Sequence, residues 1–177
     1  GQRGHQYAVG RVSNAPGLYY SAPVFDGGVF VGAVVAKSNV SNFAAWASQI
    51  KGFLTDANGV IILAGEKNWE FLAIPDARAM RLPAESLMLQ YRKSSFDTLQ
   101  VAPWTNDPRF PAAMRIGNSQ IPTLLSSKAV ADGMISAHVT YPLGQLVEFN
   151  SDRLWMFFLL TASGSLLIIA VSAVAIH

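Results

Sequence analysis

The segment Phe53–Ala64, FLTDANGVIILA, consists of two short runs of strand-forming residues around the turn Asp56-Ala57-Asn58-Gly59. Branched and aromatic residues favour strands, and asparagine followed by glycine favours a tight turn, so the segment predicts a β-hairpin. The letters D-x-N-G also occur in calcium loops. Aligning Gly59 with the loop glycine, however, puts Leu54 at the first ligand position and Gly65 where a bidentate glutamate is required. A structural turn is therefore the preferred interpretation.

Upstream of this hairpin, the residues from Tyr7 to Lys37 are typical of short strands and turns. The stretches Leu18 to Phe25 and Val29 to Ala36 are rich in β-forming residues. Asp26-Gly27-Gly28 separates them and predicts a second hairpin. The N-terminal half of the chain is thus expected to contribute an antiparallel sheet.

Between the two hairpins we expect an amphipathic helix. Ser41 can serve as its N-cap, and Gly52 suits its C-terminal end. Four apolar residues recur in between at a spacing of three to four, which gives the helix one apolar face. These residues are Phe43, Trp46, Ala47 and Ile50.

Downstream of the central hairpin, the pattern predicts a short helix around Ala84 to Tyr91 and three further strands. Gly133 separates the last two strands and favours a hairpin there. Pro142 can start a helix at its first position, and no obvious breaker follows before Leu154. The three predicted strands are Phe96 to Val101, Thr123 to Val130 and Met134 to Tyr141.

The segment Leu154 to Ile176 has 23 residues and no charged side chain. As a helix it would be about 35 Å long, enough to cross a hydrocarbon core of about 30 Å. Arg153 and Trp155 stand at its start, where charge and indole prefer the membrane interface. A buried core helix is the alternative. A patch of small residues could support helix–helix dimerisation; it comprises Thr161, Ser163, Gly164 and Ser165.

Composition narrows the classes of function. Of 177 residues, 51% are hydrophobic and 14% charged, and the net charge of +2 gives no footprint for nucleic-acid binding. With 0 cysteines, disulfides, thiol catalysis and thiolate metal sites are excluded. The 3 histidines have no suitably spaced partners, so we predict no catalytic residue, metal site or cofactor. The chain begins at Gly1 without methionine, and we expect it to be a fragment of a longer protein.

The order of several stretches carries a resemblance to a known family. YAVG at 7–10, PGLYYSAPV at 16–24 and GAVVAK at 32–37 resemble the membrane-distal half of double-Cache (PAS-like) sensor regions, closest to those of C4-dicarboxylate sensor histidine kinases. FLTDANGVIIL at 53–63 resembles the first hairpin of their membrane-proximal half, and VTYPL at 139–143 resembles its last strand.

The resemblance implies an α+β fold with PAS/Cache-like antiparallel sheets and flanking helices. It implies an incomplete distal unit with its connecting helix over residues 1–52, a proximal unit over 53–149, and one transmembrane helix within 150–177. It also implies a homodimer in the bacterial inner membrane, with a periplasmic part that senses a small anionic ligand, a carboxylate.

The same resemblance implies that this stretch is not itself an enzyme and that the parent protein is a histidine kinase of a two-component system. Relatives with this architecture also drive diguanylate cyclases or chemoreceptors, and the residues after His177 would decide between them. A membrane-anchored structural protein is an alternative of a different class. A membrane-tethered hydrolase would need an acid–base pair, which we do not find in the sequence.

The resemblance also points to ligand-binding residues in the distal half. Lys37 matches a lysine that meets one ligand carboxylate, and the loop Gly10 to Ser13 matches one that supplies hydroxyls. This chain departs from that pattern with Arg11 and Val12 before Ser13, which suggests a larger or more anionic ligand. The motif that clamps a second carboxylate in the relatives would lie before Gly1. The predicted ligand-binding residues are Lys37, Arg11, Ser13, Tyr19, Tyr20 and Ser21.

Alternation along the strand supports Lys37 independently of the resemblance. Val31, Ala33, Val35 and Lys37 fall on one strand face, where a lysine needs an anion or a route to water. A strand-end lysine that reaches solvent is the simpler alternative, as is a solvated turn position for Arg11. Tyr19 and Ser21 share one face and Tyr20 the other, so only one of the two sets can line a pocket, and core packing is the alternative for both tyrosines.

Overall fold

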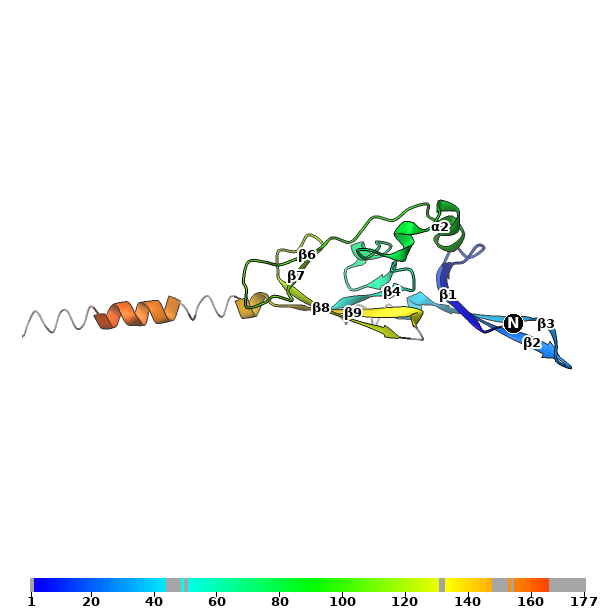
Figure 1. Cartoon of the computed structure of the whole chain (residues 1–177), viewed down its shortest axis with the longest axis horizontal. Coiled ribbons are helices and arrows are strands. Elements are labelled where there is room, and N and C mark those ends of the chain that lie inside the picture. Colours follow the sequence, from blue (N-terminus) through cyan, green and yellow to red (C-terminus); the bar gives the residue numbers. More distant parts are fainter. Residues whose placement is uncertain are drawn as a thin grey trace, which may run out of the picture. The chain divides into compact units, whose positions relative to one another are not determined.

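The computed structural model describes residues 2–43, 49, 51–130, 133–147, 153 and 155–165. It separates into two compact units, Gly1–Tyr141 and Pro142–His177. The first unit contains every strand apart from the last residue of β9, and the strands form two mostly antiparallel sheets accompanied by a few short helices (Figure 1).

The first sheet has three antiparallel strands in the order β1-β2-β3. They are β1 (Gly4–Val9), β2 (Pro16–Asp26) and β3 (Val29–Asn39). The β2–β3 hairpin confirms the prediction made from Asp26-Gly27-Gly28. Gly27 and Gly28 have φ angles of 51° and 84°, and such left-handed values in a two-residue loop match the twist of the strands on either side.

The second sheet has six strands in the order β5-β4-β9-β8-β7-β6. Strands β4 and β9 are interior strands, each paired on both sides, and β4 is buried along its whole length. The bounds are β4 (Gly52–Asp56), β5 (Ile61–Ala64), β6 (Val101–Pro103), β7 (Met114–Ile116), β8 (Thr123–Val130) and β9 (Ile135–Pro142).

The predicted hairpin at Asp56-Ala57-Asn58-Gly59 is confirmed. The backbone N–H of Gly59 donates to the Asp56 carbonyl at 3.0 Å, and Gly59 has a left-handed φ of 78°. The Asp56 carboxylate accepts the backbone N–H groups of Asn58 and Val60 at 3.0 Å and 2.9 Å. The carboxylate therefore closes the turn, as the turn interpretation requires.

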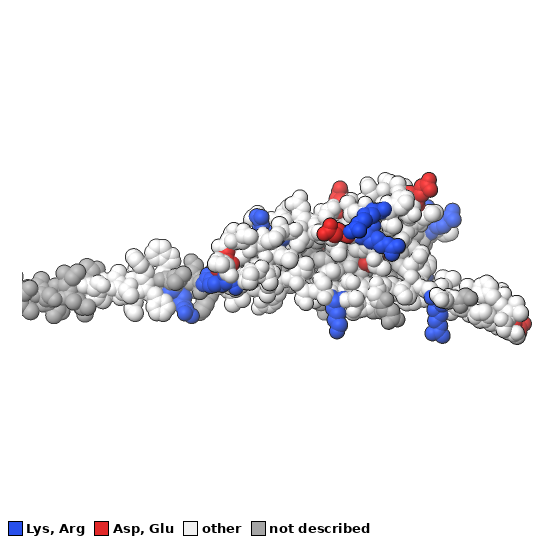
Figure 2. All heavy atoms as spheres, in the orientation of Figure 1, with Lys and Arg blue, Asp and Glu red and all other residues white. Residues whose placement is uncertain are grey.

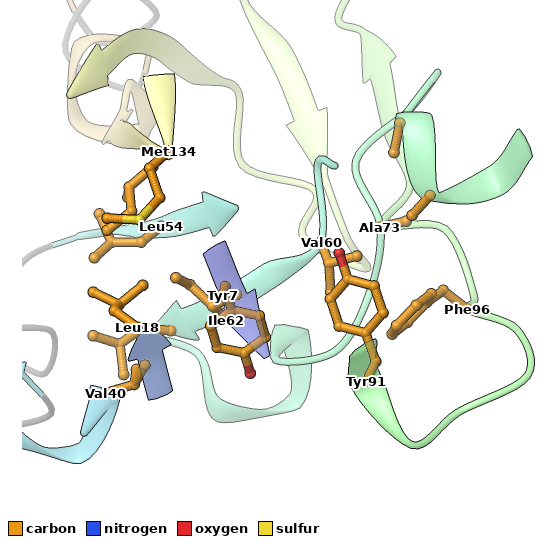
Figure 3. Close-up of a cluster of buried hydrophobic side chains, with 14 of the residues drawn as sticks. Tyr7, Leu18, Val40, Leu54, Val60, Ile62, Ala73, Tyr91, Phe96 and Met134 are labelled. Carbon is orange, nitrogen blue, oxygen red and sulfur yellow. The ribbon is translucent and has the colours of Figure 1, made fainter. Parts of the chain in front are cut away.

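One hydrophobic core joins the two sheets. Tyr7 and Leu18 of the first sheet pack in the same cluster as Leu54 and Ile62 of the second (Figure 3). Helix α2 (Ala84–Tyr91), predicted with the same bounds, adds Leu87 and Tyr91 to the cluster. A smaller cluster centres on Phe53, Ile61 and Leu99.

Several predicted elements differ from the structure. Gly52 does not end a helix; it is the first residue of β4 and pairs with Val139. A Cβ at Gly52 would overlap the carbonyl oxygen of His138, so glycine is needed there for close backbone approach. The predicted helix from Ser41 begins with a short 3-10 helix, Val40–Phe43, and residues 44–48 and 50 lie outside the described residues.

Strand boundaries in the second half of the chain also shift. The strand predicted at Phe96 to Val101 begins only at Val101, and β7 was not predicted. Both are three-residue strands, too short to give a clear alternation. Pro142 ends β9 instead of starting a helix, and helical structure begins at residue 144.

The second unit is helical at residues 144–147 and 155–165. Every side chain from Trp155 to Leu160 is apolar and 55–71% exposed. Within the described residues there is no helix with both the length and the apolar character needed to cross a membrane. Residue 154 and residues 166–176 of the predicted membrane segment lie outside the described residues.

Candidate ligand-binding site

Strand pairing places Lys37, Tyr19 and Gln6 side by side on one face of the first sheet. Tyr19 lies opposite Lys37 on β3 and opposite Gln6 on β1. Residues directly opposite in antiparallel strands project from the same face. Ser21, two residues beyond Tyr19, projects from that face as well, and Tyr20 projects from the other. The register therefore groups Tyr19 and Ser21, not Tyr20, with Lys37.

A pocket of about 500 Å³ lies beside these strands. Its lining includes four of the six predicted residues: Arg11, Tyr19, Tyr20 and Ser21. The expectation that only one of the sets Tyr19/Ser21 and Tyr20 could line a pocket is therefore wrong, because residues from both strand faces reach this one. Lys37 and Ser13 are adjacent to the pocket but do not line it. A smaller pocket of about 470 Å³, beside Tyr20, Ala22 and Ala36, belongs to the other face.

Lys37 fastens the loop that borders the pocket. Its Nζ donates to the Ser13 hydroxyl at 3.2 Å and to the Ala15 carbonyl at 3.1 Å. The same ammonium lies 5.7 Å from the centre of the Tyr19 ring, within range of a cation–π interaction. A Cβ at Gly17 would contact the Lys37 side chain, so the glycine makes room for the lysine. Lys37 thus supports both the Gly10–Ala15 loop and Tyr19.

The electrostatic character of the pocket is positive. Arg11 is in the lining, and no aspartate or glutamate is found among the described residues that surround it. In the described part of the chain, neither Arg11 nor Lys37 lies within ion-pair distance of an acidic side chain. A guanidinium without a carboxylate partner can bind an anion through two parallel hydrogen bonds. The surroundings therefore suit an anionic ligand better than a cationic one.

Sequence reasoning missed several contributors to this pocket, and Gln6 and Leu89 are two of them. Gln6 lines it from β1, and Leu89 lines it from α2. The position of Gln6 could have been inferred once β1 was paired with β2, because Gln6 then lies opposite Tyr19. Leu89 is far away in the sequence, and nothing in its local pattern indicates the pocket.

Comparisons with known proteins are consistent with this geometry. No known family model matches the chain. The chain is 33% identical over 87 residues to the C4-dicarboxylate transport sensor protein DctB of Rhizobium meliloti, a match that covers 48% of this chain and 14% of that protein. The match therefore spans only a small part of the relative's length.

Solved structures show the fold. The sensor domain of the histidine kinase DctB from V. cholerae superposes with a TM-score of 0.59 at 21% identity, over 80% of this chain and 56% of that one. The periplasmic domain of RsbU from Chlamydia trachomatis superposes with a TM-score of 0.55 at 10% identity, over 85% and 58%. The fold is PAS/Cache-like, and the predicted resemblance to sensor regions close to those of C4-dicarboxylate sensor kinases is confirmed.

Proposed function

We propose that the chain is the ligand-sensing region of a bacterial membrane receptor and that its ligand is a small carboxylate. In this proposal residues 1–52 form the membrane-distal unit, 53–149 the membrane-proximal unit, and 150–177 contain a membrane-spanning helix. The sensing part lies in the periplasm, the receptor is a homodimer in the inner membrane, and its output is a histidine kinase.

One observation carries the ligand class. The pocket beside β1 and β2 has Arg11 in its wall and no aspartate or glutamate among its described lining residues. Similarity to a C4-dicarboxylate sensor supports the same class from an independent direction. Tyr19 adds a hydroxyl group that can donate to a carboxylate oxygen. The Ser21 hydroxyl donates to the Gly4 carbonyl at 3.3 Å, and the Lys37 ammonium lies 5.7 Å from the centre of the Tyr19 ring.

The test is a thermal-shift and calorimetry screen of the chain with succinate, malate, fumarate, citrate and acetate. We expect at least one acid to raise the melting temperature because a ligand that binds only the folded state stabilises it. Arg11→Ala should weaken binding about 10-fold or more, since it removes a charge-assisted contact of roughly 1.5–3 kcal/mol.

Lys37→Ala should weaken binding less than Arg11→Ala does, because Lys37 acts through the loop and Tyr19. Lys128→Ala is the matched control, since Lys128 is an exposed strand lysine of the other sheet. Stabilisation by an acid that is unchanged in both the Arg11 and the Lys37 variants would move the site elsewhere. Failure of every acid to bind would overturn the proposed ligand class.

A further inference from the structure

A cluster of polar side chains connects the first sheet to the turn of the β4–β5 hairpin. The Asp56 carboxylate, which already accepts two backbone N–H groups of the turn, also accepts the Tyr91 hydroxyl at 2.5 Å. Burial raises the pKa of Asp56, and these hydrogen bonds oppose the rise. Burial, followed by the nearby Asp56 charge, also raises the pKa of Tyr91, so the tyrosine remains a neutral donor.

The cluster continues from Tyr91 to the backbone of β1. The Asn58 amide donates to the Tyr91 hydroxyl at 2.6 Å and to the Gln90 side-chain oxygen at 3.3 Å. Gln90 in turn donates to the backbone carbonyl of Tyr7 at 2.8 Å. The rings of Tyr7 and Tyr91 have their centres 6.0 Å apart (Figure 3). β1 is therefore attached to the second sheet by specific hydrogen bonds as well as by apolar packing.

Three consecutive residues of α2 face three different surroundings. Leu89 lines the pocket and is 69% exposed, Gln90 bonds β1, and Tyr91 is buried in the core. Successive helical residues project in directions about 100° apart, which permits this division. The last turn of α2 thus contacts the pocket, the strand behind the pocket and the Asp56 carboxylate.

The same strand segment connects the pocket to this cluster. Gln6 and Ala8 line the pocket, and Tyr7 between them provides the carbonyl that Gln90 binds. At the other end, Asp56 is the last residue of β4 and pairs with Ile135, the first residue of β9. A displacement of β1 against α2 would therefore change the hydrogen bonds that lead from Gln90 to the Asp56 carboxylate at the end of β4.

Tyr7 has one feature that suggests a second arrangement of this region. Its side chain is 1% exposed, and its hydroxyl has no hydrogen-bond partner within the described residues. A buried unpaired hydroxyl is unfavourable, so a small movement of β1 that gives it a partner would offset part of the cost of that movement. Gln90 therefore bonds the backbone carbonyl of Tyr7, while the Tyr7 hydroxyl has no hydrogen-bond partner within the described residues.

We propose that Leu89 of α2 forms part of the ligand site and that Gln90 is a positioning residue that couples β1 to the Asp56 cluster and, through it, to β4 and β9. This inference rests on the proposed function. A ligand held between β1 and Leu89 would favour one spacing of these elements over another, and only such a difference in affinity can shift the arrangement.

The first test concerns Leu89. The full chain is titrated by calorimetry with each acid of the panel, beginning with succinate. Leu89→Ala should weaken binding about 10-fold because apolar contact with the ligand is lost. Met88→Ala is the matched control, because Met88 is an exposed apolar neighbour on the same helix that does not line the pocket. Leu89→Met should bind nearly as tightly as the unaltered chain.

The second test concerns Gln90 and uses amide hydrogen exchange. In the ligand-free chain, Gln90→Met should accelerate exchange at Asn58 and Val60, whose N–H groups bond Asp56. With the acid bound, the unaltered chain should gain protection in β4 and β9, and Gln90→Met should lose that gain while still binding. Glu85→Gln, on the same helix, serves as the control.

The outcomes separate this inference from the proposed function. Binding that depends on Arg11 but is unchanged in Leu89→Ala would overturn the role of Leu89 alone. Unchanged exchange at Asn58 and Val60 in Gln90→Met would overturn the coupling alone. If no acid of the panel binds the unaltered chain, the proposed function and this inference fail together.

Discussion

His138 lies in β9 between two hydroxyl groups and against an aromatic ring. Its Nε2 is 3.0 Å from the Thr55 hydroxyl and its Nδ1 is 2.7 Å from the Ser127 hydroxyl. The imidazole is stacked on Phe53 with the ring centres 4.6 Å apart. The side chain therefore connects β4, β9 and β8, and burial lowers its pKa. A buried imidazole next to hydroxyls is held most favourably in its neutral form.

This arrangement predicts a pH dependence of stability. The pKa of His138 is lower in the folded chain than in the unfolded chain, where it is about 6.5. The unfolded state therefore binds more protons in acid, and the contribution of His138 to stability is lost as the pH falls below about 6.5. In His138→Gln the free energy of unfolding, measured with urea, should decrease less between pH 7 and pH 5.

Comparing His138→Gln with the unaltered chain separates the pH dependence due to His138 from that due to Asp56. The raised pKa of Asp56 has the opposite effect on stability, because the folded chain takes up a proton at Asp56 at a higher pH than the unfolded chain does. Since Asp56 is present in both proteins, its effect cancels in the difference. His5→Gln, which alters an exposed histidine, is the control. An identical pH profile for His138→Gln and the unaltered chain would contradict the prediction.

At the scale of elements, the prediction of secondary structure succeeded where a local cause exists. The β2–β3 and β4–β5 hairpins follow from Gly27-Gly28 and Asn58-Gly59, whose backbone conformations suit tight turns. Helix α2 follows Pro83 and ends at Tyr91, and the next residue, Arg92, has a left-handed φ of 60°. Its bounds agree with the sequence prediction of a short helix around Ala84 to Tyr91.

The elements that were missed depend on contacts between distant residues. Gly52 looks like a helix cap along the sequence, but the approach of His138 from β9 explains why it is glycine. For the candidate site, Arg11 and the Tyr19–Ser21 strand could be inferred from the sequence. Leu89 and Gln90 could not, because their positions depend on how α2 packs against β1.

The helix at residues 155–165 lies within the predicted membrane segment, so the prediction of a spanning helix can be tested there. Its apolar side chains are exposed, as expected if lipid surrounds the helix. Arginine at the centre of a membrane helix costs about 2.5–3.5 kcal/mol on insertion scales. Ser165 lies midway along Leu154 to Ile176, so Ser165→Arg should reduce the carbonate-resistant membrane fraction of the chain.

The control places the same charge outside the predicted membrane segment. Val12→Arg adds the same charge at a fully exposed loop residue and should leave the membrane fraction unchanged. Equal membrane fractions for Ser165→Arg and the unaltered chain would argue against a spanning helix at this segment.

At the scale of the whole molecule, the two sheets differ in how well they are protected from solvent. Strand β4 is paired on both sides and buried throughout, whereas β3 pairs with β2 only, within the described residues. Valines on both faces of β3 are exposed, and the face of the β2–β3 hairpin that Figure 2 shows carries few charged atoms. The hairpin is therefore expected to open at a lower free energy than the second sheet.

Hydrogen exchange measures this difference directly. In the ligand-free chain, amides of β4 and β9 should exchange on the order of 100-fold more slowly than those in the outer half of β3. The comparison is internal, since both strands are followed in one sample. Equal protection of the β3 amides and the β4 and β9 amides would contradict the expected lower stability of the β2–β3 hairpin.

The glycine at position 52 has a consequence for assembly of the second sheet. Strands β4 and β9 stand far apart in the sequence, so they meet only after a long loop of chain has closed. Sliding either strand by one residue would bring a side-chain-bearing neighbour beneath the His138 carbonyl and would turn Phe53 away from the imidazole. Misaligned pairings of β4 and β9 are therefore sterically strained as soon as they form. The absence of a Cβ at Gly52 thus favours the native register of the two strands.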